Sequence, residues 1–129
     1  MSVSILVVDD EADVAELFRQ RFRREALDGT YVMHFAYSGE QALDKLAAGI
    51  EPQLIVILSD INMPVMDGLE LLREIKTRRP DLPVMMVTAY GDDDRRRLAG
   101  EYGAAKFITK PVDFDFLKTQ LRGLSDAAD

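Results

Sequence analysis

Short apolar runs recur along the chain, and most of them end in polar residues. The runs are almost wholly apolar rather than alternating, which is typical of parallel strands that are covered on both faces. Between the runs, apolar residues recur at the spacing of amphipathic helices. We therefore predict five strands, over residues 5–8, 31–37, 54–59, 84–87 and 105–109. We also predict five helices, over residues 11–26, 39–47, 68–78, 92–102 and 113–124.

Strands that alternate with helices in this way indicate an open α/β sheet. Right-handed crossovers place helices on both faces, so we predict a doubly wound parallel sheet in a flavodoxin-like sandwich of three layers. Ligands of such sheets bind beyond the carboxyl ends of the strands. The polar residues that follow the strands are therefore the first candidates for a functional site.

The helical stripes predict which side chains are buried. The predicted buried positions are Val14, Leu17, Phe18, Phe22, Ala26, Ala42, Leu43, Leu46, Ala47, Leu69, Leu72, Ile75, Phe116, Leu117, Leu121 and Leu124. Ser38 and Asp113 are the predicted N-caps of two helices. The helix over residues 92–102 has few apolar side chains, and we expect it to be mobile. Its consecutive aspartates and arginines are expected to pair with one another on a solvated surface.

Length and composition fit one soluble domain. The chain has 129 residues, of which 47% are hydrophobic and 30% charged. We assign residues 1–124 to this domain and residues 125–129 to a polar tail, either a frayed end or the start of a linker. The net charge of −7 argues against nucleic acid as a main partner and suits divalent cations. We find no signal peptide and no membrane span, and the absence of cysteine is compatible with the cytoplasm, where we place the protein.

Five polar residues follow four of the predicted strands. They are Asp9, Asp10, Asp60, Thr88 and Lys110. Because the carboxyl ends of parallel strands meet at one edge of a sheet, these side chains are expected to share a cleft. Three carboxylates there cannot all remain ionised without compensation, and a hard divalent cation such as Mg²⁺ resolves the conflict.

The residue types in this cleft are those that phosphoryl transfer requires. A carboxylate can act as the nucleophile and form an aspartyl-phosphate, and the remaining catalysis is positioning and charge neutralisation. Lys110 supplies a cation, Thr88 supplies a hydroxyl donor, and the backbone carbonyl of Asn62 is a further oxygen ligand for Mg²⁺. Plainer interpretations are that Asp9 and Asp10 are an N-cap pair, or that Lys110 is a solvated loop residue.

These segments resemble the receiver domain of bacterial response regulators over essentially the whole chain. The segments that match are residues 7–11, 60–68, 87–89 and 109–111. The resemblance implies the strand order 2-1-3-4-5 and a signalling switch of a two-component phosphorelay. It also implies that the peptide bond between Lys110 and Pro111 is cis.

The resemblance assigns a role to each site residue. Asp60 would accept a phosphoryl group from a histidine kinase or a phosphotransfer protein, in a reaction that depends on Mg²⁺. Thr88 and Lys110 would bind the phosphoryl group. The ligands of Mg²⁺ would be Asp9, Asp10, Asp60 and the backbone carbonyl of Asn62.

Output, by the same resemblance, uses the surface of the fourth predicted helix, the fifth strand and the fifth helix. This surface would control an effector, an attached output domain or a second copy of the chain in a homodimer. Thr88 and the ring at Phe107 would form the switch. Many relatives have tyrosine at that position, and phenylalanine has no hydroxyl group to hold either state.

Two further positions depart from the pattern of the family. Pro52 lies further from Asp60 than is usual, which predicts an irregular start of the third strand. Tyr90 places a bulky ring two residues after Thr88, where it is expected to affect the access of water and the lifetime of the phosphate.

Three other functions fit the sequence less well. A Mg²⁺-dependent phosphatase with an aspartate nucleophile would carry Asp-x-Asp after the first strand, whereas Asp9 and Asp10 are adjacent. A flavin-binding module would carry a phosphate loop rich in Ser, Thr and Gly there. A receiver that only docks to partners would not need the complete site. We therefore predict a switch that is not an enzyme beyond its own phosphorylation and dephosphorylation, either as a standalone regulator or as part of a longer protein.

Overall fold

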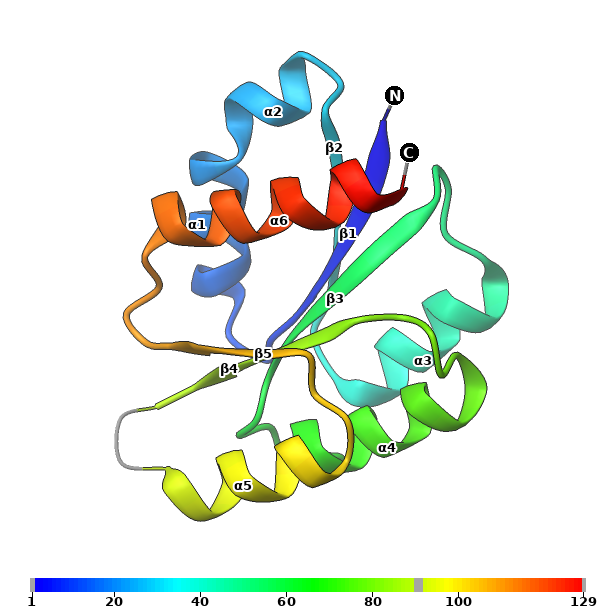
Figure 1. The fold of residues 1–129 in the computed structure, drawn as a ribbon, viewed down its shortest axis with the longest axis vertical. Helices are drawn as coiled ribbons and strands as arrows, with labels where there is room; N and C mark the ends of the chain where they lie inside the picture. Colours follow the sequence, from blue (N-terminus) through cyan, green and yellow to red (C-terminus); the bar gives the residue numbers. More distant parts are fainter. Residues whose placement is uncertain (1, 90–91, 129) are drawn as a thin grey trace.

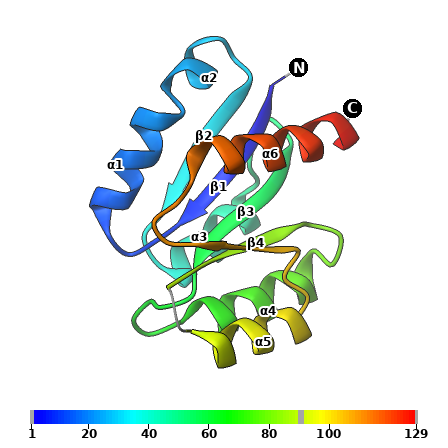
Figure 2. The ribbon, with the colours of Figure 1, turned by 60° about the vertical axis from the view of Figure 1, so that its left-hand side comes forward.

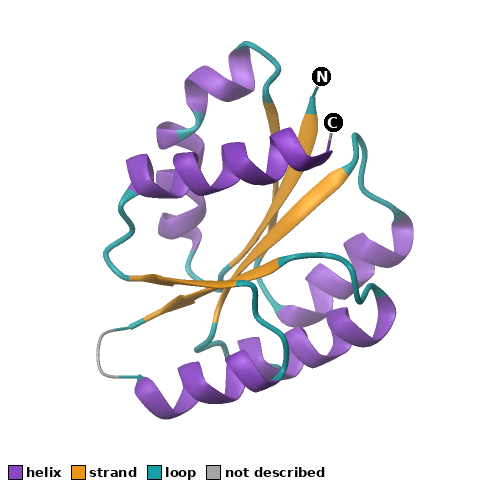
Figure 3. Cartoon of the chain, viewed as in Figure 1, coloured by secondary structure: helices purple, strands orange, loops and turns teal. Residues whose placement is uncertain are grey.

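A computed structural model of the chain describes residues 2–89 and 92–128, leaving aside the side chains of residues 127 and 128. Over these residues the chain forms one sheet of five strands and six helices (Figures 1 and 3). The strands are β1 (Val3–Val8), β2 (Tyr31–Ala36), β3 (Leu54–Asp60), β4 (Val84–Thr88) and β5 (Lys106–Thr109). The helices are α1 (Ala12–Arg21), α2 (Arg23–Leu27), α3 (Gly39–Ala48), α4 (Gly68–Arg78), α5 (Asp93–Glu101) and α6 (Phe114–Ala128).

The topology of the sheet confirms the predicted fold. The strand order is β2-β1-β3-β4-β5, and every pair of neighbours is parallel. Helices α1 and α6 pack on one face, where Phe18 and Leu117 lie in one apolar cluster. Helices α3, α4 and α5 cover the other face, where Leu43, Leu72 and Ala99 share a second cluster (Figure 2). The central strands are buried from both sides, which explains why their sequences do not alternate.

The first predicted helix is two helices, and its buried stripe is centred differently from our prediction. The chain turns at Phe22, between α1 and α2. Ala15, Phe18 and Phe22 are buried, whereas Leu17 is 40% exposed and Ala26 is also exposed. Each residue turns a helix by about 100°, so Leu17 lies well off the face that Phe18 buries. The turn at Phe22 then removes Ala26 from that face.

Other helix predictions divide into confirmed caps and misplaced apolar residues. Ser38 Oγ accepts a hydrogen bond from Gln41 N (3.1 Å), and Asp113 Oδ1 accepts one from Phe116 N (3.1 Å), as N-caps do. Phe116 is nevertheless 51% exposed, because the side chain of α6 that enters the core beside Phe18 is that of Phe114. The predicted burial of Ala47 is also wrong, since this residue is exposed.

Two observations concern the boundaries of the predicted elements. Helix α6 continues to Ala128, so most of residues 125–129 are helical; the domain boundary at residue 124 and a linker after it stay predictions. The start of β3 is irregular, as predicted, because Ser4 pairs with Leu54 and Ile5 already pairs with Val56. Over residues 2–89 and 92–128, none of the helices combines the length and apolar character needed to cross a membrane.

Phe22 should carry far more stability than Leu17 on the same helical segment. Its ring is fully buried and contacts the rings of Phe18, Tyr31 and Phe114. We expect Phe22→Ala to lower the free energy of unfolding by about 3 to 5 kcal/mol. The matched control Leu17→Ala should cost about 0.5 kcal/mol, because Leu17 is already 40% exposed and lies off the buried face. Urea denaturation followed by circular dichroism measures both, and equal costs would contradict the placement of the stripe.

Candidate functional site

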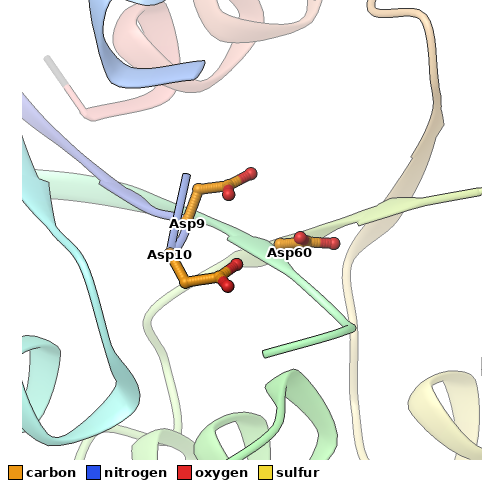
Figure 4. A group of neighbouring side chains, drawn as sticks. All are labelled: Asp9, Asp10 and Asp60. Atoms are coloured by element: carbon orange, nitrogen blue, oxygen red, sulfur yellow. The ribbon is translucent and has the colours of Figure 1, made fainter. Parts of the chain in front are cut away.

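The acidic residues predicted to share a cleft do come together at the carboxyl edge of the sheet. Asp9 and Asp10 follow β1, and Asp60 is the last residue of the neighbouring strand β3 (Figure 4). One carboxylate oxygen from each residue lies within 4.8 Å of the others. Asp9 and Asp60 are buried, whereas Asp10 is exposed. The cluster therefore has two carboxylates held by the fold and one at the opening to solvent.

Lys110 is the cation of this site. Its Nζ lies 3.4 Å from Asp60 Oδ2 and 4.0 Å from Asp9 Oδ2, so it is not a free lysine on a loop. Its backbone N donates to Thr88 O at 2.8 Å, which fixes the end of β5 against β4. The peptide bond to Pro111 is cis, as predicted.

Asp60 is held by contacts on both of its carboxylate oxygens. Oδ1 accepts a hydrogen bond of 3.3 Å from Asn62 N, and Oδ2 faces Lys110 Nζ. The residue is 5% exposed. Asp60 is therefore a carboxylate held in place at the carboxyl edge of the sheet, with little exposure to solvent.

Asp9 has an unusual electrostatic environment. Burial raises the pKa of its carboxyl from an ordinary value of 3.8 to about 6. The hydrogen bond from Glu11 N to Asp9 Oδ1 (2.9 Å) acts in the opposite direction, and the charge of Asp60 adds to the rise. The N-cap of α1 is Glu11, without a side-chain cap bond, so Asp9 and Asp10 do not form the N-cap pair considered above.

A divalent cation fits the donor set of this cluster. Asp9, Asp10 and Asp60 bring up to three negative charges together, and Lys110 compensates one of them. Hard cations such as Mg²⁺ take a few carboxylates and complete their coordination with water. The exposed side chain of Asp10 leaves the cluster open to solvent on one side.

Thr88 contributes a buried hydroxyl group at the end of β4. The residue is fully buried, and among the described residues its Oγ1 has no hydrogen-bond partner. It follows Val87, which pairs with Asp60 across the sheet. Because an unsatisfied buried hydroxyl costs stability, this group suits a ligand oxygen in the cleft.

Gly68 shows how tightly the loop after Asp60 is folded. A Cβ atom at Gly68 would lie 2.2 Å from Asp60 O and 2.6 Å from Ile61 Cα, both backbone atoms. Gly68 N also donates to Ile61 O at 2.7 Å. Asp67-Gly68 thus forms a tight turn before α4, and Asp67 Oδ1 caps α4 by accepting a hydrogen bond from Glu70 N (3.0 Å). Only a residue without a side chain allows α4 to begin this close to the site.

The charged run at the start of α5 is only in part the self-paired surface that we predicted. Arg97 does approach Asp94, at 4.0 Å on an exposed face. Arg95 instead reaches the loop after β3, where it contacts Asn62 and Asp67. These partners are distant in sequence, so helical spacing gave no signal for them. Tyr90, whose ring we expected to affect water access, lies outside the described residues.

Comparison with known protein families identifies the chain. The response regulator receiver domain matches residues 5–122. The chain is 39% identical over 119 residues to the transcriptional regulatory protein ZraR of Klebsiella oxytoca, which covers 92% of this chain and 25% of that protein. It is 37% identical over 125 residues to the response regulator MprA of Mycobacterium tuberculosis, which covers 96% of this chain and 51% of that protein. The chain thus spans a quarter to about half the length of these relatives.

Solved structures agree with this family. A response regulator receiver domain protein from Clostridium thermocellum superposes with a TM-score of 0.85 at 26% identity, over 98% of this chain and 96% of that one. The response regulator TrrA of Thermotoga maritima, in complex with Mg²⁺-BeF, superposes with a TM-score of 0.79 at 33% identity, over 95% and 98%. The chain belongs to the response regulator receiver domain family. It is therefore a module of two-component signalling, in which phosphorylation carries the signal.

Asp9→Asn should stabilise the metal-free protein at neutral pH. The raised pKa means that the folded protein binds a proton more tightly than the unfolded chain, so the stability from this proton is lost as the pH rises from 3.8 through about 6. Asparagine keeps the Oδ1 acceptor for Glu11 N without the charge. We expect a gain of about 1 to 2 kcal/mol in the free energy of unfolding at pH 7, and no gain at pH 4.

Urea denaturation in the presence of a chelator measures this difference at both pH values. Asp44→Asn is the matched control, because Asp44 is an exposed aspartate on α3. It should change the free energy of unfolding by no more than about 0.5 kcal/mol at either pH. A variant at Asp9 that is no more stable than the unmodified protein at pH 7 would contradict the electrostatic account.

Proposed function

We propose that Asp60 accepts a phosphoryl group from a histidine kinase or a phosphotransfer protein, in a Mg²⁺-dependent reaction. The observation that carries this proposal is a buried carboxylate at the end of β3, with Lys110 Nζ 3.4 Å away and two further carboxylates in range of one cation. This arrangement combines a nucleophile with the charge compensation that phosphoryl transfer needs. Membership of the receiver family supports the choice of reaction.

The proposed transfer is a substitution at phosphorus. One carboxylate oxygen of Asp60 forms a bond to the phosphorus atom as the phosphorus–nitrogen bond of a phosphohistidine breaks. The electron pair of that bond leaves with the imidazole, which takes up a proton. Thr88 Oγ1, which is buried and lacks a partner among the described residues, donates to one phosphoryl oxygen, and Lys110 Nζ neutralises another.

Asp9, Asp10, Asp60 and the backbone carbonyl of Asn62 are the proposed ligands of Mg²⁺. When bound, the ion would neutralise the carboxylates and the incoming phosphoryl oxygens. The support is the spacing of the three carboxylates, together with the complex of TrrA from Thermotoga maritima with Mg²⁺-BeF. Burial raises the pKa of Asp9 because the ionised carboxylate is poorly compensated there. A bound cation would supply the missing positive charge and favour the ionised form.

Output is proposed to use the surface formed by α5, β5 and α6, with Thr88 and Phe107 as the switch residues. Phe107 is half-buried on β5 and packs beside α5. The relatives ZraR and MprA are longer than this chain, which supports an attached output domain or a separate effector as the receiver's target. A homodimer through this surface and a cytoplasmic location complete the proposal. The chemistry of the chain is limited to its own phosphorylation and dephosphorylation.

A small phosphodonor such as acetyl phosphate, given with Mg²⁺, should add one phosphoryl group to the protein. Intact-mass spectrometry measures the addition, and peptide mapping after borohydride reduction should locate it at Asp60. Asp60→Asn should abolish the labelling, because the amide is not a nucleophile of this kind. Asp81→Asn, at an exposed aspartate between α4 and β4, is the matched control and should label like the unmodified protein. An unmodified mass under conditions that label another receiver would overturn the proposal.

Removal of divalent cations should stop the same labelling. The acidic cluster needs a cation before a phosphoryl group with its own negative charges can approach. We expect EDTA to lower the labelling rate by at least about a hundredfold, and excess Mg²⁺ to restore it. The control is Ca²⁺ in place of Mg²⁺, which tests whether charge alone is sufficient. Labelling that continues unchanged in EDTA would falsify the role of the metal.

A further inference from the structure

One guanidinium group ties the loop after Asp60 to the start of α5. Arg95 Nη1 donates to Asn62 Oδ1 at 2.6 Å, and Arg95 Nη2 donates to Asp67 Oδ2 at 3.0 Å. The other end of the same amide is held too, because Asn62 Nδ2 donates to Asp92 Oδ2 at 3.4 Å. Asp92 is the N-cap residue of α5. The amide oxygen and the amide nitrogen of Asn62 are therefore both hydrogen-bonded to residues at the start of α5.

This contact differs from the other ion pairs of the α5 surface. The side chains of Arg95 and Asp67 are each 32% exposed, whereas those of Arg97 and Asp94 are 70% and 94% exposed. Arginine in a forked geometry with two acceptors fixes direction as well as distance. An exposed pair such as Arg97–Asp94 contributes little. Of these two ion pairs, the one formed by Arg95 is therefore better suited to transmit a movement of the loop after Asp60 to α5.

Asn62 connects this contact to the chemistry of the site. Its backbone N donates to Asp60 Oδ1 at 3.3 Å, so the backbone of Asn62 is bonded to the proposed phosphoacceptor. Its side chain is bonded to α5 at the same time. A change in the hydrogen bonds of the Asp60 carboxylate therefore reaches α5 through one residue.

Helix α5 has little apolar packing to hold it in place against such a change. Of its described residues only Ala99 is fully buried, so apolar packing holds this helix weakly. The next residue, Arg96, places its guanidinium carbon 5.1 Å from the centre of the Phe107 ring. Adjacent arginines thus contact the site loop and the proposed switch ring.

We propose that Arg95 is a positioning residue that couples the phosphorylation state of Asp60 to the stability and position of α5. The inference rests on the proposed function, since it concerns the regulation of the same site. Phosphorylation of Asp60 changes the carboxylate oxygen to which Asn62 N donates. Asn62 then shifts, and its hydrogen bond with Arg95 transmits the shift to the first turn of α5. Coupling of this kind is reciprocal, so the state of α5 also changes the free energy of phosphorylation.

Hydrogen exchange measured by mass spectrometry on peptides that cover α5 tests the coupling. We compare each protein with and without acetyl phosphate and Mg²⁺, and we measure labelling of Asp60 by intact mass on the same samples. In the unmodified protein, phosphorylation should change the exchange rate of the α5 amides by at least about fivefold. In Arg95→Ala, Asp60 should still be labelled, but the phosphorylation-dependent change in α5 should disappear.

Two variants distinguish coupling from the alternative that Arg95 only stabilises α5, whatever the phosphorylation state of Asp60. Asp67→Asn keeps the Oδ1 cap for Glu70 N and loses the Oδ2 acceptor for Arg95, so it should also reduce the response of α5. Arg97→Ala is the matched control on the same helix, and it should keep the full response. A brace without coupling would make α5 exchange faster in Arg95→Ala while leaving the phosphorylation-dependent change intact.

The possible failures are distinguishable. If the unmodified protein is not labelled, the proposed function fails and the coupling falls with it. If it is labelled and α5 does not respond, or if Arg95→Ala responds like the unmodified protein, the coupling alone is wrong. Loss of labelling in a stably folded Arg95→Ala would also overturn the coupling, because it would place Arg95 in the transfer reaction itself.

Discussion

The buried carboxylates of Asp9 and Asp60 facing a single ammonium group are the constraint on which this receiver depends. Lys110 lies 3.4 Å from Asp60 and 4.0 Å from Asp9, and it compensates one negative charge. Burial raises the pKa of Asp9 to about 6, so a proton or a metal ion would compensate the second buried carboxylate. The same imbalance that costs stability in the metal-free protein prepares the site for a cation.

The sheet makes this arrangement unavoidable. Strands β1 and β3 are neighbours near the middle of the order β2-β1-β3-β4-β5, so their final aspartates meet, while β4 and β5 bring the hydroxyl of Thr88 and the ammonium of Lys110 from one side. The loop after β3 must then leave the site without covering it. Gly68 permits this, because α4 starts against the backbone of Asp60 and Ile61. Topology thus places the polar side chains of the site, and the missing side chain of Gly68 allows α4 to begin beside them.

The sequence predicted what local patterns and strand direction determine. Apolar runs marked the strands, Ser38 and Asp113 were recognisable caps, and parallel strands required the polar residues at their ends to gather. Predictions failed where a shift of one or two positions decides which side chain is buried, as with Leu17 and Phe116. The contacts of Arg95 could not be found because Asn62 and Asp67 lie 33 and 28 residues away. Helical spacing predicts which residues pair within one helix, but it does not predict contacts between a helix and another element.

The contacts of Arg95 with Asn62 and Asp67, which helical spacing did not predict, are the basis of the coupling that we propose. In the function that we propose, a small chemical change at Asp60 has to reach an output surface to which α5 contributes. Close packing would transmit the change only by moving many side chains together, whereas α5 buries little apolar surface. Directional bonds from Arg95 to Asn62 and Asp67 respond to displacements of a fraction of an ångström, because their energy depends steeply on geometry. A weakly packed helix held by a precise polar contact is therefore more sensitive to the site than a well-packed helix would be.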